Sequence, residues 1–551
     1  TAYEIVDCDW SSDVCSSDLA VARIKLLSSR RFAHISHLSP LWTDPRLVMT
    51  RRGSLRRPLQ AARRLSGGGG PVGRPIRSAK GEGYMASIAK YFDLKKRGTT
   101  VETEVRAGAT TFLVMAYIIF VNANYVGAGA AGGAIGAAGA PSAEAIFAVT
   151  ALGAGLLTIL MGVVANYPFA LAAGMGLNAV VAFQLILGLG LSWAEAMAVI
   201  VWEGIFITIL MLTGFRKAIL EAIPLNLKRA IAVGIGLFLL LIGLFEANVV
   251  VKSFAPTVPL SLFSGIGFGG SEIPVADMPH LAIFGAGLLT ALALIRRPGG
   301  LLISIGVGTL VALALGVSSI PASFISPLDS SNFVGIGQAF GAMFSVWSSG
   351  AGFLAVALAV FSIMLSDFFD TAGTMVGLGA RAGLLDSKGQ LPGSNRVLLV
   401  DSIAAMAGGA LGVSSNTTYI ESAAGIKEGG RTGLTSVVTG ALFLAAVLLS
   451  PIAGIVPAAA TAPALVIIGY LMFEAIRDVQ WKDAVDGFPV LATLIVMPLS
   501  YSITDGIGVG FLTYGILKVT SGKASDVKPL FWVSIAAFVV YFLVKLGIIA
   551  V

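Results

Sequence analysis

The body of the chain, from Thr99 onward, alternates long apolar runs with short polar loops. A helix that crosses a bilayer needs about 20 predominantly apolar residues, so these runs predict an all-α polytopic membrane protein. Fourteen transmembrane segments are expected near residues 107–126, 145–164, 168–188, 194–213, 227–246, 280–295, 301–316, 353–376, 396–412, 415–426, 433–450, 463–476, 487–503 and 506–519. Seven segments precede the connection 317–350 and seven follow it. If the halves are two copies of one unit, the odd number of segments in each half turns the second copy upside down in the membrane relative to the first. We therefore expect a 7+7 inverted repeat, in which transporters hold substrate between the halves near the membrane midplane.

The third and tenth segments are both interrupted. The third runs from Asn166-Tyr-Pro-Phe through closely spaced glycines to Asn178, and the tenth runs from Gly412 to Gly425. Proline and glycine at these places favour a short extended piece that leads into a half-helix. Because non-helical backbone at membrane depth must be buried in protein or line a cavity, we predict that the two breaks help to form one central site.

The eighth segment carries a polar stripe on an otherwise apolar helix. Asp367, Asp370, Thr371 and Thr374 follow the spacing i, i+3, i+4 and i+7, so all four face the same way. A carboxylate at the bilayer centre costs about 3 kcal/mol or more, and by default it marks a substrate or ion path. The alternative is a packing stripe satisfied by neighbouring helices, which two repelling acids one turn apart make expensive.

The break in the tenth segment adds further polar groups. The run Ser414-Ser-Asn-Thr-Thr418 supplies hydroxyl and amide groups, and Glu421 is expected one turn into the half-helix. An ionised carboxylate accepts hydrogen bonds from ring or exocyclic N–H groups, and a protonated one can donate. The free N–H groups of a half-helix N-terminus can hold an anion or a carbonyl-rich ring without cationic side chains.

Composition agrees with a membrane protein. The chain of 551 residues is 56% hydrophobic and 12% charged, whereas globular domains carry about 25% charged residues. Its 67 glycines suit helices that approach closely or unwind within the membrane. Both cysteines, Cys8 and Cys15, precede the body, and His280 is the body's only histidine. We therefore expect neither a metal site nor a cofactor.

The basic character belongs to the first part of the chain. Residues 1–97 hold 18 of the 37 Lys and Arg but only 8 of the 30 Asp and Glu, so no nucleic-acid partner is expected. Residues 1–84 combine Ser-rich, Arg-rich and Gly-rich runs without a sustained period. We expect them to be a disordered, non-native leader before a natural start at Met85; an Arg-rich targeting segment is the alternative.

Basic residues mark alternate loops of the body. They are Lys95, Lys96, Arg97, Arg216, Lys217, Lys228, Arg229, Arg296, Arg297, Arg381, Lys388, Lys427, Arg431, Arg477 and Lys482. The opposite loops 127–144, 317–350 and 451–462 contain no Lys or Arg. By the positive-inside rule, the N-terminus is cytoplasmic in a multi-pass protein of the cell's inner or plasma membrane. Residues 529–551 form a fifteenth apolar run, which either crosses the membrane or lies in its interface.

Three segments resemble a known family. Asp367-Phe-Phe-Asp-Thr-Ala-Gly-Thr374, Asn416-Thr-Thr-Tyr-Ile-Glu421 and Gly174-Met-Gly-Leu-Asn-Ala179 are similar to signature segments of the nucleobase:cation symporter-2 family. They resemble most its AzgA-like branch of adenine, guanine and hypoxanthine permeases. The resemblance runs from about Tyr91 to Lys518 and leaves out the leader.

The resemblance implies a core domain of segments 1–4 and 8–11 and a gate domain of segments 5–7 and 12–14, with an elevator-like movement of the core against the gate. The corresponding boundaries are 1–84 for the leader, 85–106 for a cytoplasmic N-terminal segment, 107–215 and 350–450 for the core, 216–349 and 451–528 for the gate with its connection, and 529–551 for a C-terminal hydrophobic helix. It also implies purine import by proton symport. Whether the carrier is a homodimer stays open.

Site residues follow from the matched motif positions. The substrate would contact Asn178, Asp367, Phe368, Asp370, Thr374, Thr418 and Glu421. Asp367, Asp370 and Glu421 would take up the coupling proton, because this chain has Thr374 at the position where some related uracil and xanthine carriers have a histidine. A flat purine needs an apolar slot with a few aligned polar groups, and Phe368 could offer a stacking face, although plain helix packing is the alternative.

Three other functions fit parts of this pattern. An anion carrier on the same 7+7 plan would use the half-helix N-termini, but three acids at one site would repel an anion. An intramembrane aspartyl hydrolase normally needs its two acids on facing elements, not one turn apart on one helix. A passive channel fits poorly with two breaks that suggest a closed central site. We therefore predict a transporter and not an enzyme.

Overall fold

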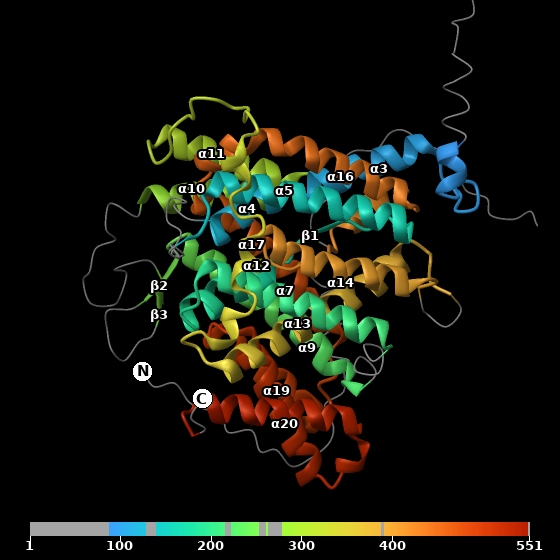
Figure 1. Ribbon diagram of the computed structural model, residues 1–551, viewed down its shortest axis with the longest axis vertical. Coiled ribbons are helices and arrows are strands. Elements are labelled where there is room, and N and C mark those ends of the chain that lie inside the picture. The colour runs from blue at the N-terminus through green and yellow to red at the C-terminus, as the bar shows by residue number, and fades with distance from the viewer. Residues whose placement is uncertain are drawn as a thin grey trace, which may run out of the picture. The chain divides into compact units, whose positions relative to one another are not determined.

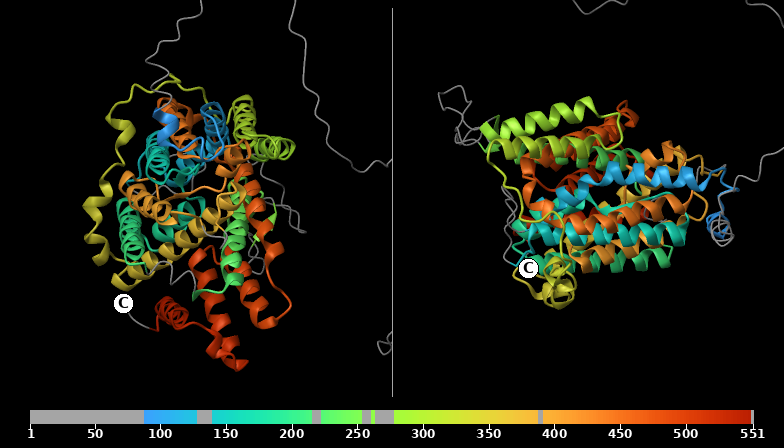
Figure 2. Two further views of the ribbon diagram at one scale, coloured as in Figure 1. Left: turned by 90° about the vertical axis from the view of Figure 1, so that its right-hand side faces the viewer. Right: turned by 90° about the horizontal axis from the view of Figure 1, so that it is seen from above.

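The computed structural model describes residues 87–127, 139–214, 222–252, 260–262, 278–386 and 391–548. The expectations for the leader, including the start at Met85, lie outside these ranges. Within them, six helices are long and apolar enough to cross a membrane, and six further apolar helices are shorter. The long helices lie side by side in one bundle (Figure 1), and most are seen end on when the bundle is turned by 90° (Figure 2). The architecture is that of an all-α polytopic membrane protein with an inverted repeat, as predicted, and the expected number of fourteen spans stays a prediction.

The helices form two groups by their packing. The first group contains α3 (Val101–Met115), α4 (Tyr117–Val126), α5 (Ala143–Leu160) with η1 (Met161–Ala165), α7 (Trp193–Leu212), α13 (Phe353–Arg381), α14 (Ser394–Leu411) and α16 (Gly433–Ala446) with η6 (Val447–Ile455). The second contains α9 (Leu225–Glu246), α10 (Met278–Ala293), α11 (Gly300–Ala314), α17 (Ala458–Phe473) with η7 (Glu474–Asp478), α18 (Ala484–Leu499) and α19 (Ile503–Thr520). The predicted domain boundaries remain a prediction.

Small residues allow the helices of the first group to approach each other closely. A Cβ atom on Gly162 would lie 2.4 Å from the carbonyl oxygen of Gly433, and one on Gly440 would lie 2.5 Å from that of Gly155. These distances are too short for any side chain, so α5 with η1 and α16 pack backbone against backbone. The glycines thus tie the two halves of the chain together.

The third and tenth segments are discontinuous, as the sequence predicts. The third consists of strand β1 (Leu171–Ala173), helix α6 (Met175–Ala179) and the π-helical turn η2 (Val180–Gly188), and the tenth of strand β4 (Asn416–Thr418) and helix α15 (Ser422–Lys427). The strands pair antiparallel, with Ala172 opposite Thr417. One expectation was wrong: Glu421 occupies the N-cap position of α15, without a capping hydrogen bond from its side chain, and does not lie one turn inside the helix. The helix begins only at Ser422 because the extended strand β4 continues to Thr418.

Other predicted segments differ in detail. The first begins earlier than expected, at Val101, and α3 and α4 follow each other through the helical residue Ala116 as one continuous span to Val126. Between and beyond the two groups lie η4 (Ser330–Phe333), α12 (Gln338–Ala342), η5 (Ser345–Ser348), the strands β2 (Val250–Lys252) and β3 (Leu260–Leu262), η8 (Ala524–Asp526) and α20 (Pro529–Lys545). β2 and β3 pair antiparallel in a second small sheet.

Helix α20 runs along the bundle beside α19. Phe531, near its start, packs edge to face on Phe511 at 4.7 Å, whereas Tyr541, near its end, donates a hydrogen bond to Asp505 at the start of α19. The two helices are therefore antiparallel over their length, which shows that α20 lies alongside the spanning helices and not across their ends. Its C-terminal end lies at the same end of the bundle as β2 and β3, opposite the start of α3 (Figures 1 and 2).

Candidate functional site

The antiparallel pair of β1 and β4, called the β1–β4 crossing below, lies at the centre of the candidate site. Two further backbone hydrogen bonds extend the ladder at both ends, from Gly174 N–H to Ser415 O and from Tyr419 N–H to Ala170 O, each 2.9 Å long. All residues of both strands are buried. Because strand pairing satisfies the backbone groups at this depth, α6 and α15 can begin at the crossing with their N-termini held in place.

Asp401 of α14 fixes the β4 strand to the acidic helix. Its carboxylate accepts hydrogen bonds from Thr371 Oγ1 at 2.7 Å, Thr418 N–H at 3.1 Å and Thr418 Oγ1 at 2.9 Å. The hydroxyls of Thr371 and Thr417 are a further 2.9 Å apart. Asp401 and the three threonine residues are almost completely buried. This network sets the position of α13 relative to the break in the tenth segment.

Two further carboxylates lie beside that network, on elements that pack against each other, α13 and α15. The Asp370 carboxylate of α13 interacts electrostatically with those of Glu421 and Asp401. Tyr117, the first residue of α4, donates a hydrogen bond of 2.6 Å to Glu421 Oε1. Asp370 and Glu421 are only partly buried, unlike Asp401, so they form the more accessible side of the cluster. The Tyr419 ring completes it, with its hydroxyl donating to the carbonyl oxygen of Ala173.

Asn178 of α6 is 1% exposed, and within the described part of the chain neither atom of its amide has a hydrogen-bond partner. A buried amide without partners costs roughly 1–3 kcal/mol and calls for an explanation, such as a ligand or a water molecule in another state of the protein. An amide offers both a donor and an acceptor to such a ligand.

The remaining predicted site residues lie on α13 or in β4. Asp367 is fully buried one turn before Asp370, and Thr374 is buried one turn after it. Thr418 is held by Asp401 as described. The ring of Phe368 is 1% exposed and belongs to the apolar core cluster that includes Leu365. The structure thus brings Asp370, Glu421 and the Asp401 network together, and places Phe368 in a packed environment.

Sequence reasoning missed Tyr117. It lies in an unbroken apolar run, and its contact with Glu421 joins residues 304 positions apart, so no local pattern reports it. No group of three or more His, Cys, Asp or Glu in the described ranges could hold a metal ion.

Comparison with known proteins decides the family. A profile of the Permease family that groups xanthine and uracil permeases matches residues 102–509. The chain belongs to the nucleobase:cation symporter-2 family. The motif resemblance in the sequence is therefore confirmed, and this symporter-family member is a multi-pass membrane transporter and not an enzyme.

Relatives match this symporter-family chain over most of its length. "Adenine permease AdeQ" of Escherichia coli (strain K12) is 37% identical over 442 residues, which cover 80% of this chain and 93% of that protein. "Guanine/hypoxanthine permease PbuG" of Bacillus subtilis (strain 168) is 36% identical over 454 residues, which cover 82% and 99%. "Putative permease MJ0326" of Methanocaldococcus jannaschii is 38% identical over 464 residues, which cover 84% and 100%.

Solved structures support the fold. The transmembrane domain of the cyanobacterial bicarbonate transporter BicA aligns with a TM-score of 0.50 at 15% identity, covering 74% of this chain and 97% of that one. Murine Slc26a9, an anion transporter in the inward-facing state, aligns with a TM-score of 0.54 at 13% identity, covering 82% and 74%. At such low identity the likeness concerns the fold alone.

Proposed function

We propose that this protein imports purine nucleobases, namely adenine, guanine and hypoxanthine, by proton symport. The observation that carries the proposal is the packing of α13, which bears Asp370, on α15, which begins after Glu421, beside the β1–β4 crossing, in a chain 37% identical to an adenine permease. Purines are flat and are edged with donors and acceptors. The two carboxylates accept N–H groups of the base, and the free amide of Asn178 offers both kinds of hydrogen bond.

The proton is expected on the Asp370 and Glu421 pair. Two carboxylates within electrostatic reach of each other repel, so a single proton shared between them relieves the repulsion. Asp401 already accepts three hydrogen bonds and is poorly placed to take it. Protonation also lowers the charge that must move when the loaded site crosses the membrane, which favours the fully loaded movement. Asp367, one turn before Asp370 on α13, is the third acid of the proposed proton-coupling set.

Movement is proposed to occur between the two helix groups, with the first group as the core and the second as the gate. The β1–β4 crossing belongs to the first group, because β1 packs on α5 and β4 on α14 and α13. The site therefore travels with the core. From the positive-inside rule applied to the basic loops, we propose a cytoplasmic N-terminus, which would put the end of α20 outside. A homodimer is compatible with this scheme and is tested by cross-linking of the purified protein in membranes.

The test is uptake into proteoliposomes of purified protein under an imposed proton gradient. Radiolabelled adenine, hypoxanthine and guanine should accumulate when the outside is acidic and stop accumulating with a protonophore, whereas uracil should not accumulate. Asp370→Asn should abolish the response to the gradient, and Asp386→Asn, an exposed acid after the same helix, should not. Accumulation that ignores the gradient would rule out proton coupling, and accumulation of bicarbonate in place of any base would favour an anion carrier.

A further inference from the structure

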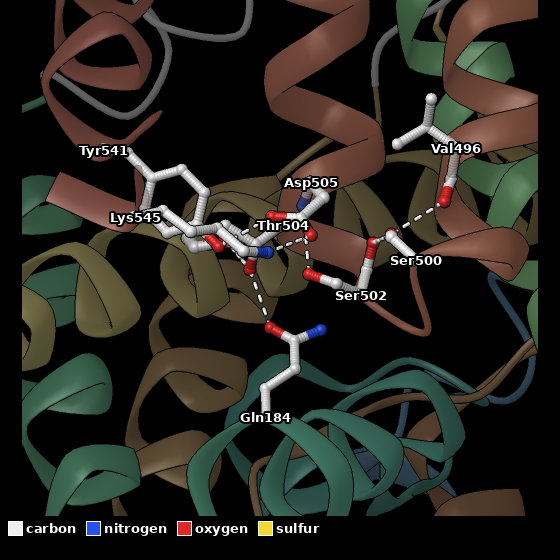
Figure 3. Close-up of polar contacts among 9 residues, drawn as sticks. Gln184, Val496, Ser500, Ser502, Thr504, Asp505, Tyr541 and Lys545 are labelled. Carbon is white, nitrogen blue, oxygen red and sulfur yellow. Dashed lines mark hydrogen bonds and ion pairs between the residues drawn. The ribbon is translucent and has the colours of Figure 1, made fainter. Parts of the chain in front are cut away.

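A polar bridge joins the two helix groups near the start of α19. The hydroxyl of Thr504 lies 2.5 Å from that of Ser362 on α13, and it donates a hydrogen bond of 2.8 Å to Gln184 Oε1 on η2. Thr504 and Ser362 are 3% and 2% exposed. Figure 3 shows Thr504 between Gln184 on one side and Asp505 with its partners on the other. One hydroxyl of the second group thus holds two elements of the first.

The two partners of Thr504 belong to the helices that carry the candidate site. Ser362 precedes Asp370 by eight residues on α13, which is about 12 Å along the helix axis. Gln184 follows Asn178 by six residues on the third segment. Both partners therefore lie between the site and the same end of the bundle, the end where β2, β3 and the end of α20 are found (Figure 1).

The start of α19 is itself held firmly. Ser502 caps the helix by accepting a hydrogen bond of 3.1 Å from Asp505 N–H. Asp505 is 4% exposed as a residue, and its carboxylate accepts a hydrogen bond of 2.8 Å from Tyr541 and pairs with Lys545 of α20 (Figure 3). The sequence suggests only an acid at a segment end, yet the structure buries it and pairs it. An anchored helix start keeps the Thr504 hydroxyl at one place, where it can select one arrangement of its partners.

We propose that Thr504 is a latch that holds the site-bearing helices against α19 and keeps the outer entrance closed. The inference rests on the proposed movement between the two groups and adds the residue that controls it. In the closed state the Thr504 hydroxyl makes both hydrogen bonds. When the entrance opens, α13 and η2 move away from Thr504, and water molecules take the place of Ser362 and Gln184 as its hydrogen-bond partners. Asp505, with Tyr541 and Lys545, acts as a positioning group for the latch and does not touch the substrate.

A population shift follows from this arrangement. Hydrogen bonds formed in only one of two states favour that state by their full net free energy, so losing them raises the fraction of the other state. Removing the hydroxyl should therefore increase the outward-open fraction at least about fivefold, the effect of a net hydrogen bond of ordinary strength. Apparent affinity for external substrate should rise, because the binding-competent state becomes more populated.

The experiment measures how often the entrance opens. The body contains no cysteine, so a variant with Cys8 and Cys15 replaced by Ser reports on one introduced thiol. Ile235→Cys is suitable, because Ile235 of α9 is 5% exposed and packs against Gly176 of α6 across the boundary between the groups. A membrane-impermeant maleimide added outside right-side-out vesicles should label this thiol only when the groups separate.

Thr504→Val removes the hydroxyl at nearly constant shape and should speed labelling at least about fivefold, whereas Thr504→Ser keeps the hydroxyl and should leave it near the starting rate. Thr513→Val is the matched control on the same helix, since among the residues that the structure describes the Thr513 hydroxyl bonds to the carbonyl oxygen of Val509 alone, 2.6 Å away. Equal labelling of the Val and Ser variants at position 504, or faster labelling from the inside only, would overturn the latch.

Two additions keep the test decisive. If Thr504→Val does not fold, Ser362→Ala removes one partner and should give a smaller increase in labelling. With both changes together, the increase should be less than the product of the two single effects, since they remove one shared contact. Labelling does not depend on the substrate, so the latch and the proposed function fail separately: missing purine uptake by the unaltered protein counts against the function alone.

Discussion

Two glutamates at helix starts have opposite surroundings. Glu104 of α3 is completely buried, and its carboxylate accepts hydrogen bonds from Arg431 N–H, Thr432 N–H and both the N–H and the hydroxyl of Thr435, at the start of α16. Glu421, at the start of α15, is partly exposed and accepts one side-chain hydrogen bond in the described ranges, from Tyr117. A saturated carboxylate near a helix N-terminus stabilises the fold, whereas one with free lone pairs is available to a ligand or a proton.

Asp401 shows that closeness to the site does not decide whether an acid is saturated with hydrogen bonds, like Glu104, or available to a ligand, like Glu421. It lies beside Asp370, yet its three hydrogen bonds to Thr371 and Thr418 make it resemble Glu104 in its surroundings. We therefore divide the buried acids by the number of hydrogen bonds that each accepts. Substitution of a saturated acid should lower the unfolding temperature of the protein. Substitution of an acid that accepts few hydrogen bonds should lower the rate of transport and leave the unfolding temperature unchanged.

The largest effect is expected for Glu104→Gln. The amide turns an N–H₂ group toward backbone donors and leaves buried N–H groups at the start of α16 without an acceptor, which costs about 3–5 kcal/mol. Thermal unfolding in detergent should show a marked loss of stability and a low yield of monodisperse protein. Glu102→Ala, an exposed acid of the same helix, should change little. A stable but inactive Glu104→Gln protein would break the comparison.

For Glu421→Gln we expect the opposite pattern. Tyr117 can still donate to the amide oxygen, so the unfolding temperature should stay near that of the unaltered protein. Uptake of adenine should fall about 100-fold, or about 2.7 kcal/mol, because the amide can neither take up a proton nor accept two N–H groups. The measurement is initial uptake rate at equal protein in the membrane. Loss of folding comparable to that of Glu104→Gln would place Glu421 in the structural class.

Asp401→Asn tests the comparison with a saturated acid that lies next to the candidate site. Its amide nitrogen would face a hydroxyl or N–H group in a buried network, at a cost of about 2 kcal/mol. Stability and uptake should fall together, since Asp401 positions Thr418 and α13 without binding substrate. Asp526→Asn, an exposed acid, is the control for the chemical change. A change in uptake with no change in unfolding temperature would move Asp401 into the ligand-binding class.

The sequence alone predicts where the acidic helix and the interrupted segments lie, but it does not predict which acids are saturated with hydrogen bonds. The spacing of Asp367, Asp370 and Thr374 and the breaks near Asn178 and Glu421 are local patterns, and they predict an acidic helix beside two interrupted segments. The pairing of β1 with β4 joins chain segments about 245 residues apart and has no local signature. Glu104 looks like an ordinary acid in the first turn of a helix, because its partners follow more than 320 residues later.

The smallest effect is expected for Tyr117→Phe, which tests whether the hydrogen bond from Tyr117 to Glu421 stabilises the fold or only orients the carboxylate. The change removes the one side-chain hydrogen bond described for Glu421 and leaves an apolar ring in a buried position, so stability should hardly change. Without the phenol, the carboxylate is less firmly oriented toward the site, and the KM for adenine should rise about threefold to tenfold, near 1 kcal/mol, with kcat affected less. Tyr470→Phe, an exposed tyrosine of α17, is the matched control. If Tyr117→Phe instead lowered stability as much as Asp401→Asn, the single bond would be structural, and the division by hydrogen-bond number would not separate folding from transport.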